Sequence, residues 1–139
     1  MRRGSVGGRI APIAAGCALA AAGAYVALND PSAAGSRFPS CAFRELTGLW
    51  CPGCGLTRGM HALFSGDVAE AVSYNIFTPV VAVVIVGAWW WWARRAFGTS
   101  RPSILRRVPA SGWMAIAGVV VLYGVLRNLP VEPLRALAP

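Results

Sequence analysis

Residues able to bind a metal ion or exchange disulfides are concentrated in one segment near the middle of the chain. They are Cys41, Cys51, Cys54 and His61, the only histidine. Cys51 and Cys54 are three positions apart, a spacing at which two thiols can share a metal ion or close a small disulfide ring. A glycine follows Cys54 and permits a positive φ, which turns backbone amides toward the sulfurs. What the chain does therefore depends on what these thiols bind or exchange.

Two structural interpretations of the cysteines remain open. In an oxidising compartment a disulfide from Cys41 to Cys51 or Cys54 would pin the segment and leave one thiol over. Alternatively, the run 51–55 has the form of a zinc knuckle, and adding Cys41 and His61 gives a Cys₃His set for Zn²⁺. His61 lies two helical turns past Cys54, roughly 10 Å along a helix axis, which makes it an awkward ligand partner.

A third interpretation is redox chemistry by Cys51 and Cys54, with Cys41 as a resolving thiol. We expect a short amphipathic helix from about 55 to 64, because apolar residues recur there at helical spacing. Cys54 would precede it, so the helix dipole and Arg58 would favour the Cys54 thiolate. No βαβ pattern of the thioredoxin type surrounds the cysteines, which weakens this interpretation. The chain is small and its apolar runs hold few ionisable groups, so no ion or proton pathway is evident and we favour a non-enzymatic role.

The rest of the chain has the composition of a membrane protein. Apolar residues make up 56% and charged residues 13%, against roughly 25% charged residues in soluble domains. Three uncharged runs approach the roughly 20 residues that a spanning helix needs. They predict membrane helices at 10–29, 76–93 and 108–126. The first run has two alternatives to a retained helix. It could be a cleaved signal peptide, although it is longer than such peptides usually are. It could also be lipidated at Cys17, although the apolar run continues beyond that cysteine.

The distribution of arginine predicts the orientation. Arginines precede the first run and fill the loop 94–107, whereas the segment 30–75 holds three arginines against four carboxylates. By the positive-inside rule the N-terminus and the loop 94–107 are cytoplasmic, so we expect the cysteine segment and the tail 127–139 on the extracytoplasmic side. The tryptophans 89–92 would form an interfacial belt. This arrangement argues against nucleic acid as a partner.

Turn and capping residues divide the segment 30–75. Thr47-Gly48 predicts a turn, and Pro52 suits the first turn of a helix. Asp67 with Glu70 three residues on predicts a second helix start, which would end near Asn75.

Polar residues near the predicted membrane boundary form a second candidate site. They are Thr57, Arg58, Asn75, Arg127 and Asn128. We expect them to cluster under the cysteines, the alternative being contact of the arginines with lipid phosphates.

Together these residues resemble a family of small bacterial membrane proteins catalogued as a domain of unknown function (DUF 2752). The family pattern is a Cys, a Thr-Gly turn, Cys-Pro-x-Cys-Gly-x-Thr-Arg, a helix, Gly-Asp and an Asn before an apolar span. The likeness runs over about 38–130, including the Arg-Asn-x-Pro at 127–130. In many relatives a Pro follows the Asn directly, whereas here the Pro comes at position 79. The resemblance implies a membrane protein and no particular activity.

The sequence thus predicts one all-α membrane domain over 1–139, with three spans and one or two short helices in an extracytoplasmic cysteine loop. We expect a multi-pass protein of the plasma (inner) membrane that acts as an accessory or assembly subunit. Its partners would be lipid and another membrane protein or a second copy, and its only candidate cofactor is zinc. The rivals are a thiol–disulfide oxidoreductase and a Cys₃His zinc protein.

Overall fold

The computed structural model describes residues 6–98 and 109–131, and these form six α-helices with no strand among them. The helices are α1 (Val6–Leu28), α2 (Ala42–Thr47), α3 (Leu56–Phe64), α4 (Val68–Tyr74), α5 (Thr78–Ala96) and α6 (Ala110–Leu126). The prediction of an all-α fold is therefore confirmed for the part of the chain that is described.

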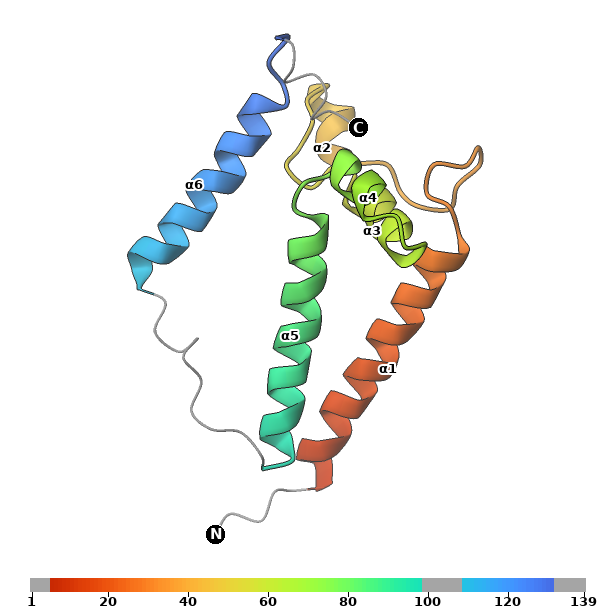
Figure 1. Ribbon diagram of the computed structural model, residues 1–139, viewed down its shortest axis with the longest axis vertical. Helices are drawn as coiled ribbons and strands as arrows, with labels where there is room; N and C mark the ends of the chain where they lie inside the picture. The colour runs from red at the N-terminus through yellow and green to blue at the C-terminus, as the bar shows by residue number, and fades with distance from the viewer. Residues whose placement is uncertain (1–5, 99–108, 132–139) are drawn as a thin grey trace.

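The three longer helices extend from one end of the molecule, where the short helices gather (Figure 1). α1 and α6 end there and α5 begins there. α3 packs against α1, α4 and α5, and α4 also packs against α5. α4 and α5 are bent by 104° at the break between them. The cysteine segment is consequently held where the ends of several helices converge.

Within residues 6–98 and 109–131, one helix is long and apolar enough by itself to cross a membrane. It covers Arg9–Leu28, with a mean hydropathy of 1.8. A second candidate arises only if the bent pair of α4 and α5 counts as one span, and α6, apolar throughout, has 17 residues. The arrangement of three spans at 10–29, 76–93 and 108–126 therefore stays a prediction.

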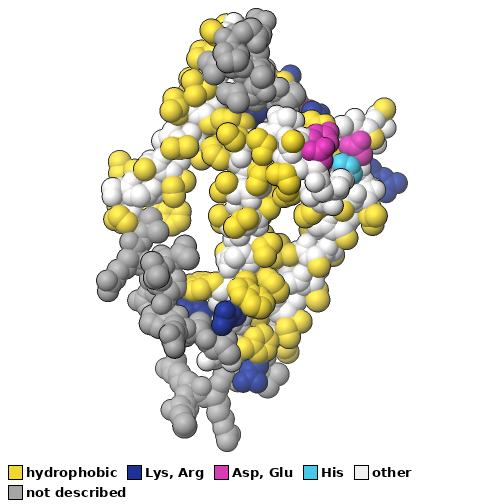
Figure 2. Space-filling model, viewed as in Figure 1, with side chains coloured by type: hydrophobic (Ala, Val, Ile, Leu, Met, Phe, Trp, Pro, Cys, Tyr) yellow, Lys and Arg dark blue, Asp and Glu magenta, His cyan; other side chains and the backbone are white. Residues whose placement is uncertain are grey.

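The long helices present apolar side chains outward (Figure 2). On α6 the exposed residues include Trp113, Met114, Val121 and Leu122, and α5 exposes a similar run of valines. Charged side chains on the face shown lie toward the two ends of the molecule. Exposed apolar side chains thus run along both α5 and α6.

α1 and α5 converge at the end opposite the cysteines. There the indole Nε1 of Trp89 donates a hydrogen bond to the carbonyl oxygen of Pro12, 2.9 Å away. Gly16 makes the approach possible, because a Cβ at this position would lie 2.6 Å from the Trp89 ring. A small residue on one helix thus receives the large ring of the other.

Two of the predicted short helices are confirmed. α3 covers the expected segment, and the Asp67 side chain caps α4 by accepting a hydrogen bond from the backbone N–H of Glu70 at 2.8 Å. α4 ends at Asn75 as expected. The suggestion that Pro52 lies in the first turn of a helix is wrong. Gly55 adopts φ 86° and α3 begins only after it, so Pro52 lies in the preceding turn.

The segment contains a third short helix, α2, that the sequence did not predict. Gly48 ends it in the left-handed region at φ 72°, and the Gly48 N–H donates to the carbonyl oxygen of Arg44. The turn expected at Thr47-Gly48 is thus the C-terminal cap of a helix. The loop 94–107 and the tail 127–139 lie partly outside the described residues, so the arginines at 101, 106 and 107 have no structural account.

Candidate metal centre

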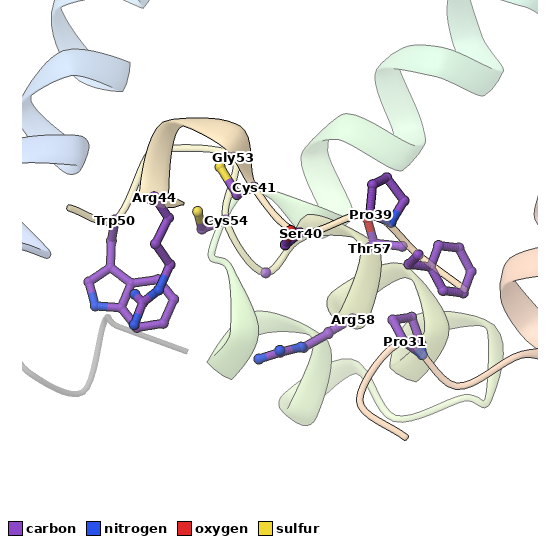
Figure 3. A pocket seen from close by; sticks show the side chains of 12 residues that line it. Pro31, Pro39, Ser40, Cys41, Arg44, Trp50, Gly53, Cys54, Thr57 and Arg58 are labelled. Atoms are coloured by element: carbon purple, nitrogen blue, oxygen red, sulfur yellow. The ribbon is translucent and has the colours of Figure 1, made fainter. Parts of the chain in front are cut away.

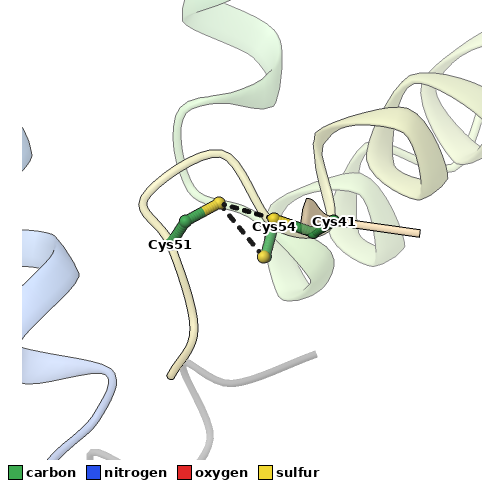
Figure 4. Close-up of side chains that lie close together, drawn as sticks. All are labelled: Cys41, Cys51 and Cys54. Atoms are coloured by element: carbon green, nitrogen blue, oxygen red, sulfur yellow. Dashed lines mark hydrogen bonds between the residues drawn. The ribbon is translucent and has the colours of Figure 1, made fainter. Parts of the chain in front are cut away.

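Three sulfur atoms converge beside the short helices. The Sγ atoms of Cys51 and Cys54 are 3.1 Å apart, and those of Cys41 and Cys51 are 3.4 Å apart (Figure 4). All three lie within 4.8 Å of one another. Zinc–sulfur bonds of about 2.3 Å in a tetrahedral site place sulfurs about 3.8 Å apart. The observed spacing is therefore close to that of three ligands on one metal ion.

Turns at both ends of the loop produce this convergence. Cys41 occupies the N-cap position of α2, and Gly48 reverses the chain after the helix. The next turn is closed by a hydrogen bond of 3.1 Å from the N–H of Cys54 to the carbonyl oxygen of Cys51. Gly55 then redirects the chain into α3. Two glycines with positive φ thus bring sulfurs from sequence-distant positions together.

The thiols differ in environment. Cys54 is only 8% exposed, and its burial, together with the Cys51 thiol, raises its pKa to about 12. Hydrogen bonds from the backbone N–H of Arg44 and then from the Cys51 thiol lower the pKa of Cys41. The expectation that the Cys54 thiolate is favoured by the α3 dipole is therefore wrong. The reason is that Cys54 is buried and that Gly55, which follows it, is the residue at the α3 N-cap.

His61 does not join the three cysteines. Its Nδ1 atom lies 2.8 Å from the carbonyl oxygen of Val26 on α1, so the ring fastens α3 to α1. Among the described residues, the converging group of possible ligands comprises the three cysteines alone. The structure thus offers a Cys₃ set and does not assemble the Cys₃His set that the sequence suggested.

The carbonyl oxygens of the cysteine turn are bound by two buried side chains. Asn75, which is 0% exposed, donates from Nδ2 to the carbonyl oxygens of Pro52 and Cys54, at 2.8 and 3.0 Å. Arg127 donates from Nη1 to those of Cys51 and Cys54, both at 3.0 Å. Residues at the ends of α4 and α6 thus hold the turn from behind.

Asn128 holds the residue before the turn. Its Oδ1 accepts a hydrogen bond from the N–H of Trp50, and its Nδ2 donates to the Trp50 carbonyl oxygen, each at 2.8 Å. This two-point pairing resembles one rung of a backbone ladder and fixes the loop to the end of α6. Three of the five residues in the predicted polar cluster, Asn75, Arg127 and Asn128, therefore surround the cysteine loop.

Arg127 is a buried cation with unused donors. It is 2% exposed, and its Nε and Nη2 atoms are buried without a hydrogen-bond partner in the described part of the chain. Its guanidinium carbon lies 5.0 Å from the centre of the Tyr123 ring. A buried charge is costly unless an opposite charge or hydrogen bonds compensate it. The site behind the cysteines is therefore electropositive.

The other two predicted cluster residues, Thr57 and Arg58, lie on a separate feature. They line a cavity of about 490 Å³ whose wall also includes Cys41, Cys54, Arg44 and Trp50 (Figure 3). The guanidinium carbon of Arg44 lies 3.0 Å from the centre of a Trp50 ring. The expected single cluster is thus divided, with one part behind the cysteines and one part on the cavity beside them.

Comparison with known proteins bears on this segment. Residues 41–90 match the family described as a protein of unknown function (DUF2752). The resemblance to this family is confirmed. No curated protein and no solved structure matches the chain.

The DUF2752 match contains all three cysteines and Asn75, but it ends before Arg127 and Asn128. The wider likeness over 38–130 is therefore covered only in part. Sequence reasoning missed three contributors to the site, namely Arg44, Trp50 and Gly124. The glycine lets α6 approach the turn, since a Cβ on it would lie 2.8 Å from the Pro52 ring. No sequence signal distinguishes this glycine from the others in the helix.

Proposed function

We propose that Cys41, Cys51 and Cys54 bind one thiophilic metal ion, with Zn²⁺ as the natural candidate, in a membrane protein that acts as a non-enzymatic accessory subunit. The convergence of three sulfurs within 4.8 Å carries the proposal. A disulfide needs two cysteines and leaves the third without a role, whereas a metal ion uses all three.

Charge compensation supports the metal over free thiols. Zn²⁺ with three thiolates has a net charge of about −1, because each bound thiol loses its proton. Arg127 binds the carbonyl oxygens of Cys51 and Cys54, and among the described residues its buried Nε and Nη2 have no hydrogen-bond partner. A metal–thiolate centre in front of this guanidinium would offset its buried charge. Three neutral thiols would leave it uncompensated.

The proposed role of the metal is structural. A bound ion would fix the turn from Cys51 to Cys54, whose carbonyl oxygens are the acceptors for Asn75 and Arg127. Cys41 would bring the start of α2 to the same ion. The metal would thereby join α2, the start of α3 and the ends of α4 and α6.

We place this centre on the extracytoplasmic side of a membrane that α1, α5 and α6 cross. Arg9 begins the apolar stretch of α1, and Arg94 and Arg95 end α5, which gives the end opposite the cysteines its positive charge. The positive-inside rule puts that end in the cytoplasm. The exposed apolar surfaces of α5 and α6 would contact lipid and another membrane protein or a second copy of the chain.

The rival function is thiol–disulfide exchange. It is favoured by the 3.1 Å separation of the Cys51 and Cys54 sulfurs and by the lowered pKa of the more accessible Cys41. The raised pKa of Cys54 opposes a role for this thiol as the attacking group. The two functions predict different properties for the reduced protein, since only the metal centre retains an ion.

The test is the metal content of the full chain, purified in maltoside micelles under reductant. We expect one zinc ion per chain by elemental analysis, and its loss in Cys51→Ser and Cys54→Ser. Cys17→Ser, in α1 and away from the cluster, is the matched control and should retain zinc. His61→Ala should retain it too. Metal-free wild-type protein, with intact mass showing a disulfide once reductant is removed, would contradict the proposal.

A further inference from the structure

We propose that the cavity beside the cysteines binds a small oxyanion, a carboxylate or a phosphate, which supplies the fourth ligand of the metal ion. The inference rests on the metal site proposed above and adds the class of molecule that completes it.

The coordination number leaves one position open. Zinc in proteins takes four ligands, and sites with three protein ligands bind water or another small ligand in the fourth position. In the described part of the chain no histidine, aspartate or glutamate joins the three cysteines. Two of the cysteines, Cys41 and Cys54, line the cavity wall. A fourth ligand can therefore reach the ion from the cavity.

The charges around the cavity select an anion. Arg44 and Arg58 line it, and no aspartate or glutamate in the described ranges does. The metal with three thiolates contributes about −1 and the two guanidinium groups about +2, so an anion lowers the net charge. Guanidinium groups bind carboxylate and phosphate with paired N–H donors. A cationic ligand would be repelled by these side chains, and a neutral acceptor would gain hydrogen bonds without the added attraction between opposite charges.

Arg44 and Arg58 approach the cavity from different elements. In Figure 3 the Arg58 side chain extends from α3 toward the Arg44–Trp50 pair, with Cys54 above them. The Arg44 guanidinium lies over the Trp50 ring, and a guanidinium stacked on an aromatic ring keeps the N–H groups on its edge able to donate. Trp50 is itself fixed by Asn128. One of the two cations is therefore preorganised.

The volume sets the size of the ligand. A cavity of about 490 Å³ lies within the range of about 300–1,000 Å³ for small-molecule sites. The residues that line the cavity belong to the segment 31–58, which begins just after α1 ends. The oxyanion can therefore come from a free metabolite or from a phospholipid headgroup. Both sources present the same chemistry to Arg44 and Arg58.

Cobalt substitution separates the metal from the anion. The full chain in maltoside micelles is loaded with Co²⁺, and its visible spectrum is recorded during titration with inorganic phosphate, acetate or phosphatidylglycerol. Thiolate-to-cobalt charge-transfer bands report the three cysteines, while a shift of the d–d bands reports a new fourth ligand. We expect a d–d shift that saturates as the anion is added. The anion affinity obtained from it should be about tenfold lower or more in Arg58→Gln and in Arg44→Gln. Arg95→Gln, on α5 at the opposite end, should leave it unchanged.

The outcomes are distinct. A response to phosphate or acetate identifies a free anion as the source, and a response to phosphatidylglycerol alone identifies a headgroup; either supports the proposal. Charge-transfer bands with no d–d response to any probe overturn the anion site and leave the metal site standing. Absence of the charge-transfer bands overturns both. A response that is unchanged in both cavity variants also overturns the anion site.

Discussion

The guanidinium of Arg127 donates a hydrogen bond to the carbonyl oxygen of Cys54, 3.0 Å away, although the two residues are 73 positions apart. The same Nη1 atom reaches the Cys51 carbonyl oxygen. This contact joins the end of α6 to the turn that carries two of the three converging sulfurs. The positive charge of Arg127 and the proposed metal–thiolate centre would stabilise each other.

Arg127→Gln should therefore weaken metal binding. The shorter side chain loses the positive charge and the bonds to the two carbonyl oxygens, and residues in such outer-shell positions contribute about 10- to 100-fold to metal affinity. Zinc competition with a chromogenic chelator measures the change. Arg95→Gln, whose guanidinium lies over Trp91, is the control and should bind zinc as the wild type does. Equal zinc affinity in the wild type and both variants would show that Arg127 does not support metal binding.

Asn75→Ala should destabilise the fold. Asn75 is wholly buried and donates to the Pro52 and Cys54 carbonyl oxygens. The variant takes the Asn75 donor from the Pro52 oxygen and leaves Arg127 to bind the Cys54 oxygen, so we expect a loss of about 1–3 kcal/mol. Thermal unfolding in maltoside micelles measures the loss. Asn29→Ala removes only an exposed bond to its own helix and should have a small effect. Similar unfolding temperatures for the two variants would show that the Asn75 bonds do not stabilise the turn.

Local features of the cysteine segment were predictable because they depend on neighbouring residues. The apolar spacing of Leu56, Met60 and Leu63 gives α3, and the Asp67 cap gives α4. The convergence of Cys41 on the other two cysteines was not predictable to the same degree. It depends on α2, whose six residues are too short for a periodic signal, and on the reversal at Gly48.

The ligand set and the polar cluster required tertiary information. His61 is a reasonable zinc ligand by residue type, but the docking of α3 on α1 turns it to the Val26 carbonyl oxygen. Arg127 and Arg58 look equivalent in sequence, yet α6 buries the first behind the turn while α3 places the second on the cavity. Residue type was enough to single out His61, Arg58 and Arg127 as candidates. Which of them contacts the cysteine turn depends on how the helices pack.

Gly59→Ala tests the packing of α3. A Cβ at this position would meet the Thr78 side chain and lie 2.9 Å from the carbonyl oxygen of Ala71, so we expect a loss of about 1–3 kcal/mol from overpacking. Gly118→Ala is the matched control on α6, because nothing lies within 4 Å of its Cβ position. This control should be neutral or slightly stabilising, since alanine favours helix. Thermal unfolding of both variants gives the comparison, and an unaffected Gly59→Ala would contradict the close contact of α3 with α4 and α5.

The metal-free, reduced protein should show ordered thiol reactivity. Iodoacetamide near neutral pH should modify Cys41 before Cys54, because backbone N–H groups lower the pKa of Cys41 and burial raises that of Cys54. Peptide mapping after timed quenching measures the order. Modification of Cys54 first would contradict the assigned environments.

The raised pKa of Cys54 also affects stability. The thiol has an ordinary pKa of 9.0 in the unfolded chain and about 12 in the fold, so the fold favours the protonated form. Its contribution to stability is fully present below pH 9 and is lost as the pH rises toward 12. Metal-free Cys54→Ala should lack this part of the pH dependence, whereas Cys17→Ser should keep it. Parallel pH profiles for Cys54→Ala and the wild type would contradict the burial of this thiol.

The number of sulfurs bound to zinc tests the central claim most directly. X-ray absorption at the zinc edge of the protein, purified under reductant, measures both the number and the distance of sulfur neighbours. We predict three sulfurs at about 2.3 Å and one lighter atom. A zinc ion bound by nitrogen and oxygen alone, or no zinc retained by a folded and fully reduced chain, would contradict a metal centre formed by Cys41, Cys51 and Cys54.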